Sequence, residues 1–506
     1  MREYEDYIIV MMKKKVVIIG AGVSGMTAGI YALQYGFDVE IIERNLSVGG
    51  LCTGWQRRGT YIDGCIHWLT ESDRGALSGL WREIGALDEQ TEVFHYDIYS
   101  QAKIGDKVVN FYTDPEKLLE ELLAHSESEA DKEWMRKYVK AVKVCKHNAI
   151  TVHKPYHQWN VIDIIKLLCK VGPALPTMKK YSTLSIRDFV AQLKSESLKH
   201  AFTHSLVPDE FSLFSLMSTY AGLACRNSGT PIGGSKAFVE RIKAKYLSLG
   251  GKLTLRTDVD EIVIDGNKAT GVKLTDGSVV SADYVIPACD VHFTMKKLLK
   301  GKYKIEEMQS RDDDKEMNPT YSMMLVSFRT NKDLSNVVHN RYVKCDTYDV
   351  LGYPIDVLYI KHFGYDKTLS KNGETVVQAI VNTNENMFNK LSKMSTEEYK
   401  TYKMSLAKCL EEKIYEADGD LYGELELLDV ATPLTFTHYC NSYKGTFMTY
   451  MYTKNNKQMK LHNNCLPISN LAMANHWMMV PGGIPIAAMQ GKFAAMTIAQ
   501  YDKKAK

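Results

Sequence analysis

The stretch KKKVVIIGAGVSGMTAGIYALQYGFDVEIIER, residues 13–44, decides the fold of this chain. Its residues Val16 to Ile19 form a continuous apolar, β-branched run, which is typical of a parallel strand buried on both faces. Three glycines follow in a GxGxxG pattern, Gly20, Gly22 and Gly25. The first permits a tight turn, the second lets the backbone approach a pyrophosphate, and the third lets the next helix pack close to the sheet.

The residues around these glycines complete a strand–helix–strand unit. We predict a helix from about Val23 to Tyr35, whose N-terminal amides face the phosphates, and a second strand at DVEII, residues 38–42. Glu43 follows that strand, where an acid accepts hydrogen bonds from a ribose and repels a 2′-phosphate. A lone GxGxxG is weak evidence, but strand, helix, second strand and acid agree here. The sequence therefore predicts a dinucleotide site.

Two glycine pairs elsewhere extend this site. Gly49-Gly50 follows the acid in SVGGLCTGW (47–55), and Gly482-Gly483 precedes an Ala- and Met-rich segment within HWMMVPGGIPIAAMQGKFAAM (476–496). Glycine is enriched mainly at helix C-termini, so a pair at a helix start needs another reason. Either pair alone is best interpreted as an ordinary turn. Taken with the first loop, the two pairs predict bare backbone along FAD rather than NAD.

Three separated stretches resemble the FAD-dependent amine oxidase and phytoene desaturase superfamily. The opening stretch is VVIIGAGVSGMTAGIYALQYGFDVEIIERNLSVGG, and the central one runs from PIGGSKAF to VVSADYVIPACD (231–290). The tail comprises ATPLTFTHYCNSYKGTF (431–447) and PISNLAMANHWMMVPGGIPIAAMQGKFAAM (467–496). Centre and tail are most similar to the branch of phytoene desaturases, carotenoid isomerases and retinol saturases. The segments from about residue 85 to 230 and from about 300 to 430 carry much less of the resemblance.

The resemblance implies an α/β fold with a Rossmann-type, glutathione-reductase-like FAD-binding domain assembled from residues 13–84, 231–295 and 460–503. It implies an inserted α+β substrate-binding domain from residues 85–230 and 296–459. It also implies roles for residues along the cofactor: Gly20, Gly22, Gly25 and Glu43 at the ADP half, Gly49 and Gly50 alongside, Val259 at the adenine, and Gly482, Gly483 and Ile484 at the flavin ring.

The chain departs from the family pattern at three places. The usual arginine after the Gly49-Gly50 pair is Leu51, so one phosphate contact is missing or replaced. The glycine that follows Asp63 is displaced by one position, to Gly64. A glycine before the last loop is Asn475, and because Asn tolerates left-handed conformations, we expect the turn to survive there.

Other residues are candidates for the chemistry itself. His67 follows the loop that the resemblance places beside the flavin, so it is our candidate for proton transfer or substrate orientation; a structural histidine is the alternative. Trp68 and Trp477 are candidate walls of an apolar substrate cavity, with core packing as the alternative. The ten cysteines are scattered with no CxxC, which favours reduced thiols in a cytoplasmic protein and no metal site.

Charge is uneven along the chain, although the net charge is only +3. Thirteen Lys and Arg lie between Trp134 and Lys199 against three acids, and apolar runs such as VIDIIKLLCKVGPALPTM (161–178) lie among them. An anionic membrane surface would suit such a patch, which would place the protein on the inner face of a membrane; a solvated face is the alternative. No nucleic-acid-binding motif accompanies the charge.

These observations predict an FAD-dependent oxidoreductase. Its substrate would be a long apolar molecule such as a carotenoid, retinoid or unsaturated lipid, whose C–C or C=C bonds it desaturates, saturates or isomerises. A flavin amine oxidase and a non-catalytic flavin- or lipid-binding protein are the alternatives. Because no second GxGxxG follows a strand, we expect no Rossmann domain for NAD(P)H. The flavin would then exchange electrons with the substrate and an external acceptor, or cycle without net redox. The first 15 residues lack the basic start and long apolar run of an export signal.

Overall fold

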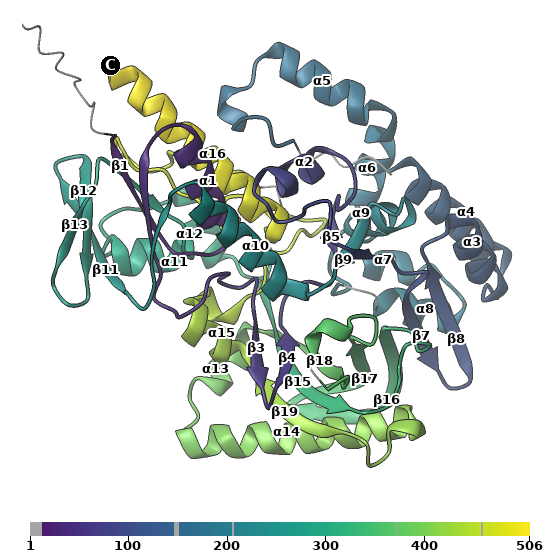
Figure 1. Cartoon of the computed structure of the whole chain (residues 1–506). Coiled ribbons are helices and arrows are strands. Elements are labelled where there is room, and N and C mark those ends of the chain that lie inside the picture. The colour runs from purple at the N-terminus through teal and green to yellow at the C-terminus, as the bar shows by residue number, and fades with distance from the viewer. Residues whose placement is uncertain (1–12, 146–150, 205–206, 371, 457–458, 506) are drawn as a thin grey trace, which may run out of the picture.

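The computed structural model describes residues 13–145, 151–204, 207–370, 372–456 and 459–505 (Figure 1). Residues 1–12, most of the stretch in which an export signal was sought, lie outside this description, as does Lys146 of the basic segment. Within it, no helix is both long enough and apolar enough to cross a bilayer.

A four-stranded parallel sheet follows from the glycine-rich opening. Its strands, in spatial order, are β10 (Lys252–Thr254), β2 (Asp38–Ile42), β1 (Lys15–Ile19) and β14 (Tyr284–Pro287). Helix α1 (Val23–Gln34) connects β1 to β2, so both strands and the helix lie where the sequence predicts them. The last four residues of β1 are buried, as expected for a parallel strand covered on both faces.

The last helix of the chain packs against the first. Helix α16 (Ile484–Ala505) runs beside α1 (Figure 1). A side chain at Gly491 would meet the Ser24 carbonyl oxygen at 2.2 Å and Thr27 Cβ at 2.9 Å, so glycine permits this close contact. Helix α10 (Gly234–Ser248) also contacts α1. Segments more than 450 residues apart in the sequence therefore share one core.

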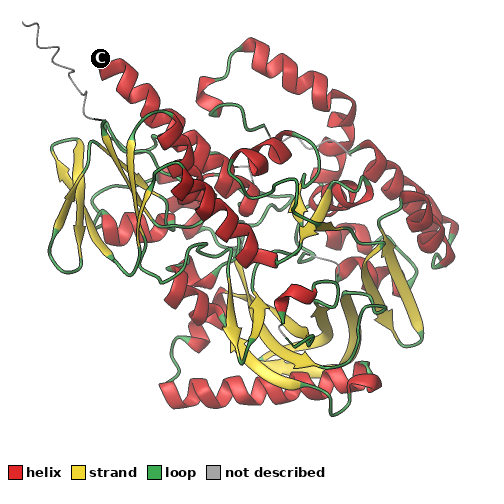
Figure 2. Cartoon of the chain, viewed as in Figure 1, coloured by secondary structure: helices red, strands yellow, loops and turns green. Residues whose placement is uncertain are grey.

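A second, antiparallel sheet of seven strands forms the other half of the molecule (Figure 2). Its spatial order is β19 (Glu426–Ala431), β15 (Tyr321–Thr330), β18 (Thr375–Asn384), β17 (Tyr353–His362), β16 (Asn340–Val350), β7 (Ile98–Ile104) and β8 (Lys107–Tyr112). Only β16 and β7 pair in parallel. Helix α14 (Thr396–Ala417) covers this sheet with Leu406, Leu410 and Ile414.

Helices between β8 and β9 form a layer of their own. They are α3 (Pro115–Ala124), α4 (Glu129–Val144), α5 (Val161–Val171), α6 (Leu175–Ser182), α7 (Ile186–Val190), α8 (Glu196–Thr203) and α9 (Leu213–Ala224). Their shared core is aromatic, with Phe111, Tyr138, Phe189, Phe202 and Tyr220 fully buried. Helix α5 lies at the outer edge of the molecule, at the top of Figure 1.

The remaining elements are short or peripheral. The strands are β3 (Gly54–Arg57) with β4 (Thr60–Asp63), β5 (Leu69–Thr70), β6 (Val93–Phe94) and β9 (Ser228–Pro231), and the sheet of β11 (Val259–Asp265), β12 (Lys268–Leu274) and β13 (Val279–Ser281). The helices are α2 (Ala76–Glu83), α11 (Val291–Phe293), α12 (Glu306–Asp313), α13 (Glu385–Leu391) and α15 (Pro433–Cys440). The mixed α/β architecture has the two parts that the sequence predicts, and the domain boundaries stay a prediction.

Candidate active site

One cavity of about 1310 Å³ lies between the two halves of the molecule. It exceeds the roughly 300–1,000 Å³ of a drug-sized pocket. Its walls include both early glycine loops, the Gly482-Gly483 loop and side chains from the seven-stranded sheet and from α5 and α6. The cavity therefore has room for a dinucleotide and a second molecule together.

The first glycine loop forms one end of this cavity. Gly20 has a φ of 101°, a left-handed value that glycine adopts without strain. Gly22 precedes α1 and lies beside Gly49, whose amide donates to the Ala21 carbonyl at 2.8 Å. A Cβ at Gly25 would be 2.0 Å from the Gly20 carbonyl oxygen, so this third glycine permits close helix–sheet packing, as its place in the pattern predicts.

Glu43 lies at the same end of the cavity as the first glycine loop. Its side chain is 6% exposed and lines the cavity. One carboxylate oxygen accepts from the Ala21 amide at 2.8 Å, and the other accepts from the amide and the side chain of Asn45 at 2.9 Å. A carboxylate has about four acceptor positions, so these three donors hold it in place and leave one position for a ribose hydroxyl. Val259, at the start of β11, lines the cavity nearby.

The Gly482-Gly483 loop lies at the far end of the cofactor region. Both glycines have left-handed φ values, 82° and 88°. A Cβ at Gly483 would have no neighbour closer than 3.9 Å, so a side chain there would project into open space that glycine leaves free. Ile484 begins α16, as predicted. The first turn of that helix carries its positive dipole end, and its residues Ile484 to Ala487 line the cavity.

Asn475 corrects one expectation. It is extended, with φ −154° and ψ 170°, so no left-handed turn exists where the family glycine is replaced. Its side-chain oxygen instead accepts from the Trp477 amide at 2.9 Å. Asn475 lines the cavity, and its buried amide nitrogen has no hydrogen-bond partner within the described chain. A buried donor without a partner costs about 1–3 kcal/mol, so this atom fits a ligand acceptor.

These four observations fit FAD. The glycine cradles, the pre-oriented Glu43, the helix N-terminus and the free Asn475 donor line one continuous cavity. Leu51, in place of the family arginine, packs among apolar side chains. Arg44 is the arginine that lines the cavity, and sequence reasoning missed it because its position carries no motif signal.

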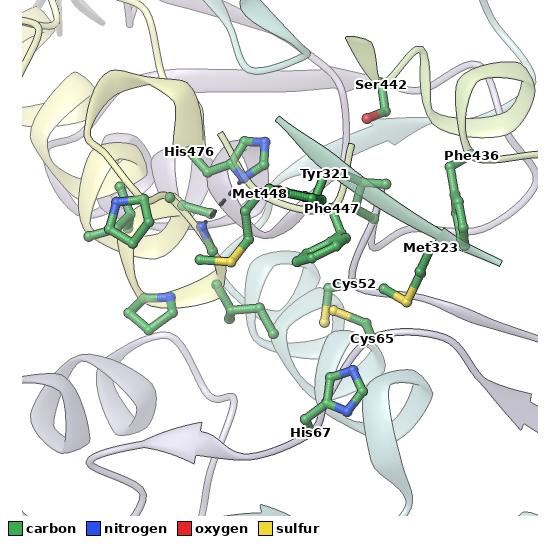
Figure 3. A pocket seen from close by; sticks show the side chains of 18 of the residues that line it. Cys52, Cys65, His67, Tyr321, Met323, Phe436, Ser442, Phe447, Met448 and His476 are labelled. Carbon is green, nitrogen blue, oxygen red and sulfur yellow. Dashed lines mark hydrogen bonds between the residues drawn. The ribbon is translucent and has the colours of Figure 1, made fainter. Parts of the chain in front are cut away.

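His67 lines the inner part of the cavity, where Figure 3 shows it with Cys52 and Cys65. A buried lysine, Lys361 of β17, donates to His67 Nδ1 at 3.2 Å and to the Ile66 carbonyl at 3.3 Å. Burial and the Lys361 cation hold the pKa of His67 well below its usual value. The ring is therefore neutral near pH 7, with Nδ1 as acceptor and the proton on Nε2.

The two tryptophans have different places. Trp68 is partly buried, lines the cavity and packs edge-on against Tyr99. Trp477 is fully buried and does not line the cavity, so its prediction as a substrate wall is wrong. Its ring packs against His292, Tyr443 and Tyr450, where three aromatic contacts explain a large apolar side chain.

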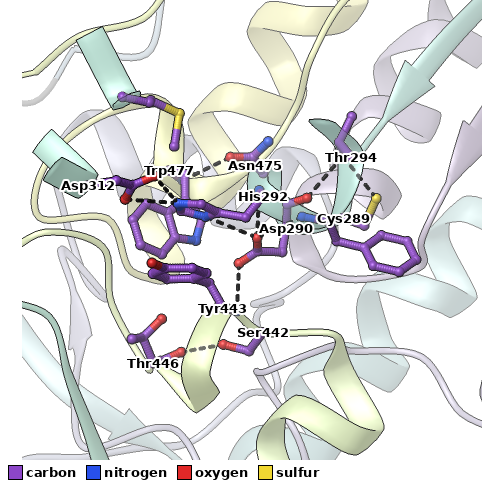
Figure 4. A network of polar contacts seen from close by, with 12 residues as sticks. Cys289, Asp290, His292, Thr294, Asp312, Ser442, Tyr443, Thr446, Asn475 and Trp477 are labelled. Carbon is purple, nitrogen blue, oxygen red and sulfur yellow. Dashed lines mark hydrogen bonds and ion pairs between the residues drawn. The ribbon is translucent and has the colours of Figure 1, made fainter. Parts of the chain in front are cut away.

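A polar network beside the cofactor end was not predicted (Figure 4). Asp290 lines the cavity, and its carboxylate accepts from the His292 amide at 2.8 Å and the Tyr443 amide at 3.1 Å. His292 lies between Asp290 and Asp312, with Nδ1 3.4 Å from the first carboxylate and Nε2 3.1 Å from the second. Although burial opposes it, these two aspartates raise the pKa of His292.

The inner walls are apolar and reach toward α5. Phe436, Phe447, Met323 and Met448 line this part (Figure 3), and Leu167 of α5 and Met178 of α6 line it from the helical layer. The opposite side of α5 exposes Val161, Ile162, Ile164, Ile165 and Leu168, each at 49% or more. No group of three or more His, Cys, Asp or Glu residues in the described chain is arranged to hold a metal.

The chain is similar to known flavin-containing proteins. The model of a family described as flavin containing amine oxidoreductase matches residues 23–499. Among curated relatives, the lycopene-forming phytoene desaturase of a Paracoccus species is 26% identical over 296 residues, 56% of each chain. That of Pseudescherichia vulneris is 23% identical over 338 residues, 65% of each chain. Both alignments thus span less than two thirds of the relatives' length.

Two solved structures have the same fold. An oxidoreductase from Methanosarcina mazei has a TM-score of 0.58 at 15% identity, covering 96% of this chain and all of its own. Cyclohexylamine oxidase from Brevibacterium oxydans has a TM-score of 0.56 at 13% identity, covering 97% of this chain and all of its own. At such identities the likeness establishes the fold alone.

Proposed function

The chain belongs to the flavin-containing amine oxidoreductase family, with FAD as its cofactor, and from this premise we propose its reaction. The protein acts on C–C or C=C bonds of a long apolar substrate, such as a carotenoid, a retinoid or an unsaturated lipid, by desaturation, saturation or isomerisation. The similarity to phytoene desaturases supports this substrate class.

A single observation carries the proposal: the residues expected to hold FAD and a long apolar wall belong to one continuous cavity. Bound FAD would supply two-electron redox chemistry, which the protein does not perform itself. The chain's task is to hold an apolar molecule against the cofactor and to exclude water. Side chains such as Phe436, Phe447 and Met448 suit that task.

His67 is the residue that we propose for proton handling. Because Lys361 occupies Nδ1, the imidazole presents Nε2–H as a donor on its other edge. A neutral imidazole can both give a proton at Nε2 and orient a polar end group of a substrate. Lys361 acts through His67 and is a positioning residue.

The amide end of α16 is the second element with a chemical task. Its free N–H groups and positive dipole lie behind Gly482 and Gly483, where they favour negative charge on a bound ring. Gly483 keeps a side chain out of that contact. Asn475 adds a donor that the described residues leave without a partner.

We propose that α5 docks the protein on an anionic membrane surface. Its outer face exposes five large apolar side chains, while its inner residue Leu167 lines the cavity. Lys166, Lys170, Lys179 and Lys180 form no ion pair with any described carboxylate, whereas Lys154 and Arg187 in the same segment are paired. Unpaired lysines around an apolar face match an interfacial helix, which would give a lipid substrate a short route inward.

The test combines a spectrum with a mass spectrum. The purified holoprotein is mixed anaerobically with liposomes that contain an acyclic polyene, the flavin absorbance is followed, and extracted lipids are analysed by mass. We expect a change in polyene bond order or geometry that requires bound FAD. Flavin reduction by primary amines, with release of hydrogen peroxide once oxygen is admitted, and no reduction by polyenes, would establish the amine oxidase alternative. Tight FAD with no turnover of either class would favour the non-catalytic alternative.

A further inference from the structure

Two cysteines that are 13 positions apart in the sequence face each other across the β3–β4 hairpin. The hairpin register pairs Gly54 with Asp63 at its open end. Pairing continues one step further, because the Gly64 amide donates to the Thr53 carbonyl at 3.0 Å. The next pair in this register is Cys52 and Cys65.

The two thiols are in contact. The Cys65 side chain acts on the Cys52 thiol, and Figure 3 shows the two sulfur atoms next to each other. Directly opposed residues on antiparallel strands have Cβ atoms about 4.5–5.5 Å apart, and a disulfide needs about 3.5–4.5 Å. A small local movement therefore suffices to join these free cysteines.

Both cysteines line the cavity that fits FAD. Cys52 lies two residues after Gly50, and its amide donates to the Gly49 carbonyl at 3.1 Å. Cys65 precedes His67 by two residues on the opposite side of the hairpin. The pair thus lies between the loop that we expect along the cofactor and our candidate for proton transfer.

The surroundings keep the pair from bulk oxidants while giving it a neighbouring cation. Cys52 is 4% exposed, and the neighbouring Cys65 side chain, together with burial, holds the pKa of its thiol well above the usual value. Such a thiol reacts slowly with dissolved oxidants, which attack thiolates. Lys361 lies close enough for its cation to interact with Cys65, and a cation stabilises negative charge that develops on sulfur during oxidation.

We propose that Cys52 and Cys65 are a dithiol/disulfide pair that exchanges two electrons with FAD. In one direction the two S–H bonds break and one S–S bond forms, while two electrons and two protons pass to oxidised FAD. In the other direction reduced FAD returns them, the S–S bond breaks and both thiols re-form. Atoms and electrons balance with no further reactant.

The pair gives the site an electron route that needs no second nucleotide domain. A small thiol that enters the cavity would reduce the disulfide by exchange, and the dithiol would then reduce FAD; a small disulfide would withdraw electrons by the reverse path. This inference depends on FAD binding and not on the proposed apolar substrate. Failure with every polyene would leave it intact.

The first experiment maps the bond in the holoprotein. Because these thiols react slowly, the protein is incubated with excess diamide until the number of free thiols no longer falls. Remaining thiols are then alkylated, and peptides are analysed by mass under non-reducing conditions. We expect a Cys52–Cys65 cross-link. Cys440→Ser is the matched control, because Cys440 lines the same cavity but contacts the Gly50 carbonyl instead of a thiol, and it should leave the cross-link intact. A Cys65–Cys440 cross-link, or none at all, would overturn the proposal.

The second experiment counts electrons. Diamide-treated holoprotein is titrated anaerobically with dithionite, with the flavin absorbance and alkylated thiols followed together. Wild type should take up about four electrons per FAD, two for flavin and two for the disulfide, whereas Cys52→Ser and Cys65→Ser should each take up about two. Equal uptake by all three proteins would contradict an electron-exchanging pair even if the cross-link forms. Retention of FAD by both variants, read from absorbance, shows that they remain folded.

Discussion

The two ends of the cavity are built from different kinds of contact. The cofactor end consists of backbone: glycine turns, helix amides and a carboxylate held by amides. The inner end consists of side chains that meet across long sequence separations, such as His67 with Lys361, 294 residues away. A site built from tightly packed backbone tolerates almost no added side-chain atom. A site built from titratable side chains changes its chemistry when a single side chain gains or loses a proton.

Gly25 gives the largest expected effect and tests the backbone end. In Gly25→Ala the new Cβ would lie 2.0 Å from the Gly20 carbonyl oxygen and 3.1 Å from Ala288 Cβ. Neither can move without disturbing the sheet, so we expect a loss of about 3 kcal/mol or more in the free energy of unfolding, with loss of FAD. Denaturant unfolding and the flavin absorbance of the purified protein measure both.

Gly79→Ala is the control for this substitution. Gly79 lies in the short helix α2 with no atom within 4 Å of an added Cβ. Alanine is the better helix former, so stability should rise by about 0.5 kcal/mol with FAD retained. If Gly25→Ala behaved like Gly79→Ala, close packing at the third glycine would not matter.

His292 tests whether the cofactor end also depends on side-chain charge. Its raised pKa means that the paired, charged form contributes fully to stability below about pH 6.5, and that the contribution is lost as pH rises through the higher folded-state pKa. His292→Gln leaves Asp290 buried without its cation, so we expect a loss of about 3 kcal/mol at pH 6 that shrinks at alkaline pH.

Urea unfolding at several pH values measures this difference between wild type and His292→Gln. The groups that face His292 are Asp290, Asp312 and the stacked Tyr443 ring, with Trp477 edge-on. His438→Gln, at an exposed position of α15, is the control and should change little at any pH. A loss that grows with pH would contradict the charged network.

Substitutions on helix α5 test the proposed membrane-docking surface beside the side-chain end of the cavity. Replacing Ile164 and Ile165 with Glu removes two exposed apolar side chains, 49% and 52% exposed, and adds negative charge. We expect about a 100-fold loss of partitioning onto anionic liposomes, measured by co-sedimentation. Val279→Glu, on the distant strand β13 and 60% exposed, should have no such effect. Equal losses would show that α5 has no special role.

The contrast between the two ends also explains what the sequence could predict. Strands at 15–19 and 38–42, the helix between them and the start of α16 follow from glycine spacing and apolar runs, because each is encoded within a few residues. Lys361 and the Cys52–Cys65 contact follow from hairpin register and sheet pairing, which carry no spacing signal. Trp477 was misplaced because a tryptophan near a ligand loop can face either the cavity or the core.

Substitution of Lys361 has the smallest expected effect on stability, and it tests the side-chain end of the cavity most directly. Burial lowers its pKa from 10.5 to about 8, although Asp63 and Cys65 oppose the shift. The unfolded chain therefore binds more protons between about pH 8 and 10.5, and the stability of wild type should rise with pH through that window. Lys361→Met removes the buried charge, so we expect it to be more stable than wild type by about 2 kcal/mol at pH 7, with the gain gone near pH 10. Unfolding free energies at both pH values measure this gain, and Lys268→Met, at an exposed position of β12, is the control.

The same variant tests how Lys361 orients His67. Because His67 Nδ1 loses its donor in Lys361→Met, the ring should be free to carry its proton on either nitrogen, which is visible in the imidazole ¹⁵N shifts. A variant that is less stable at pH 7 and keeps one tautomer would mean that Lys361 stabilises the fold and does not orient His67.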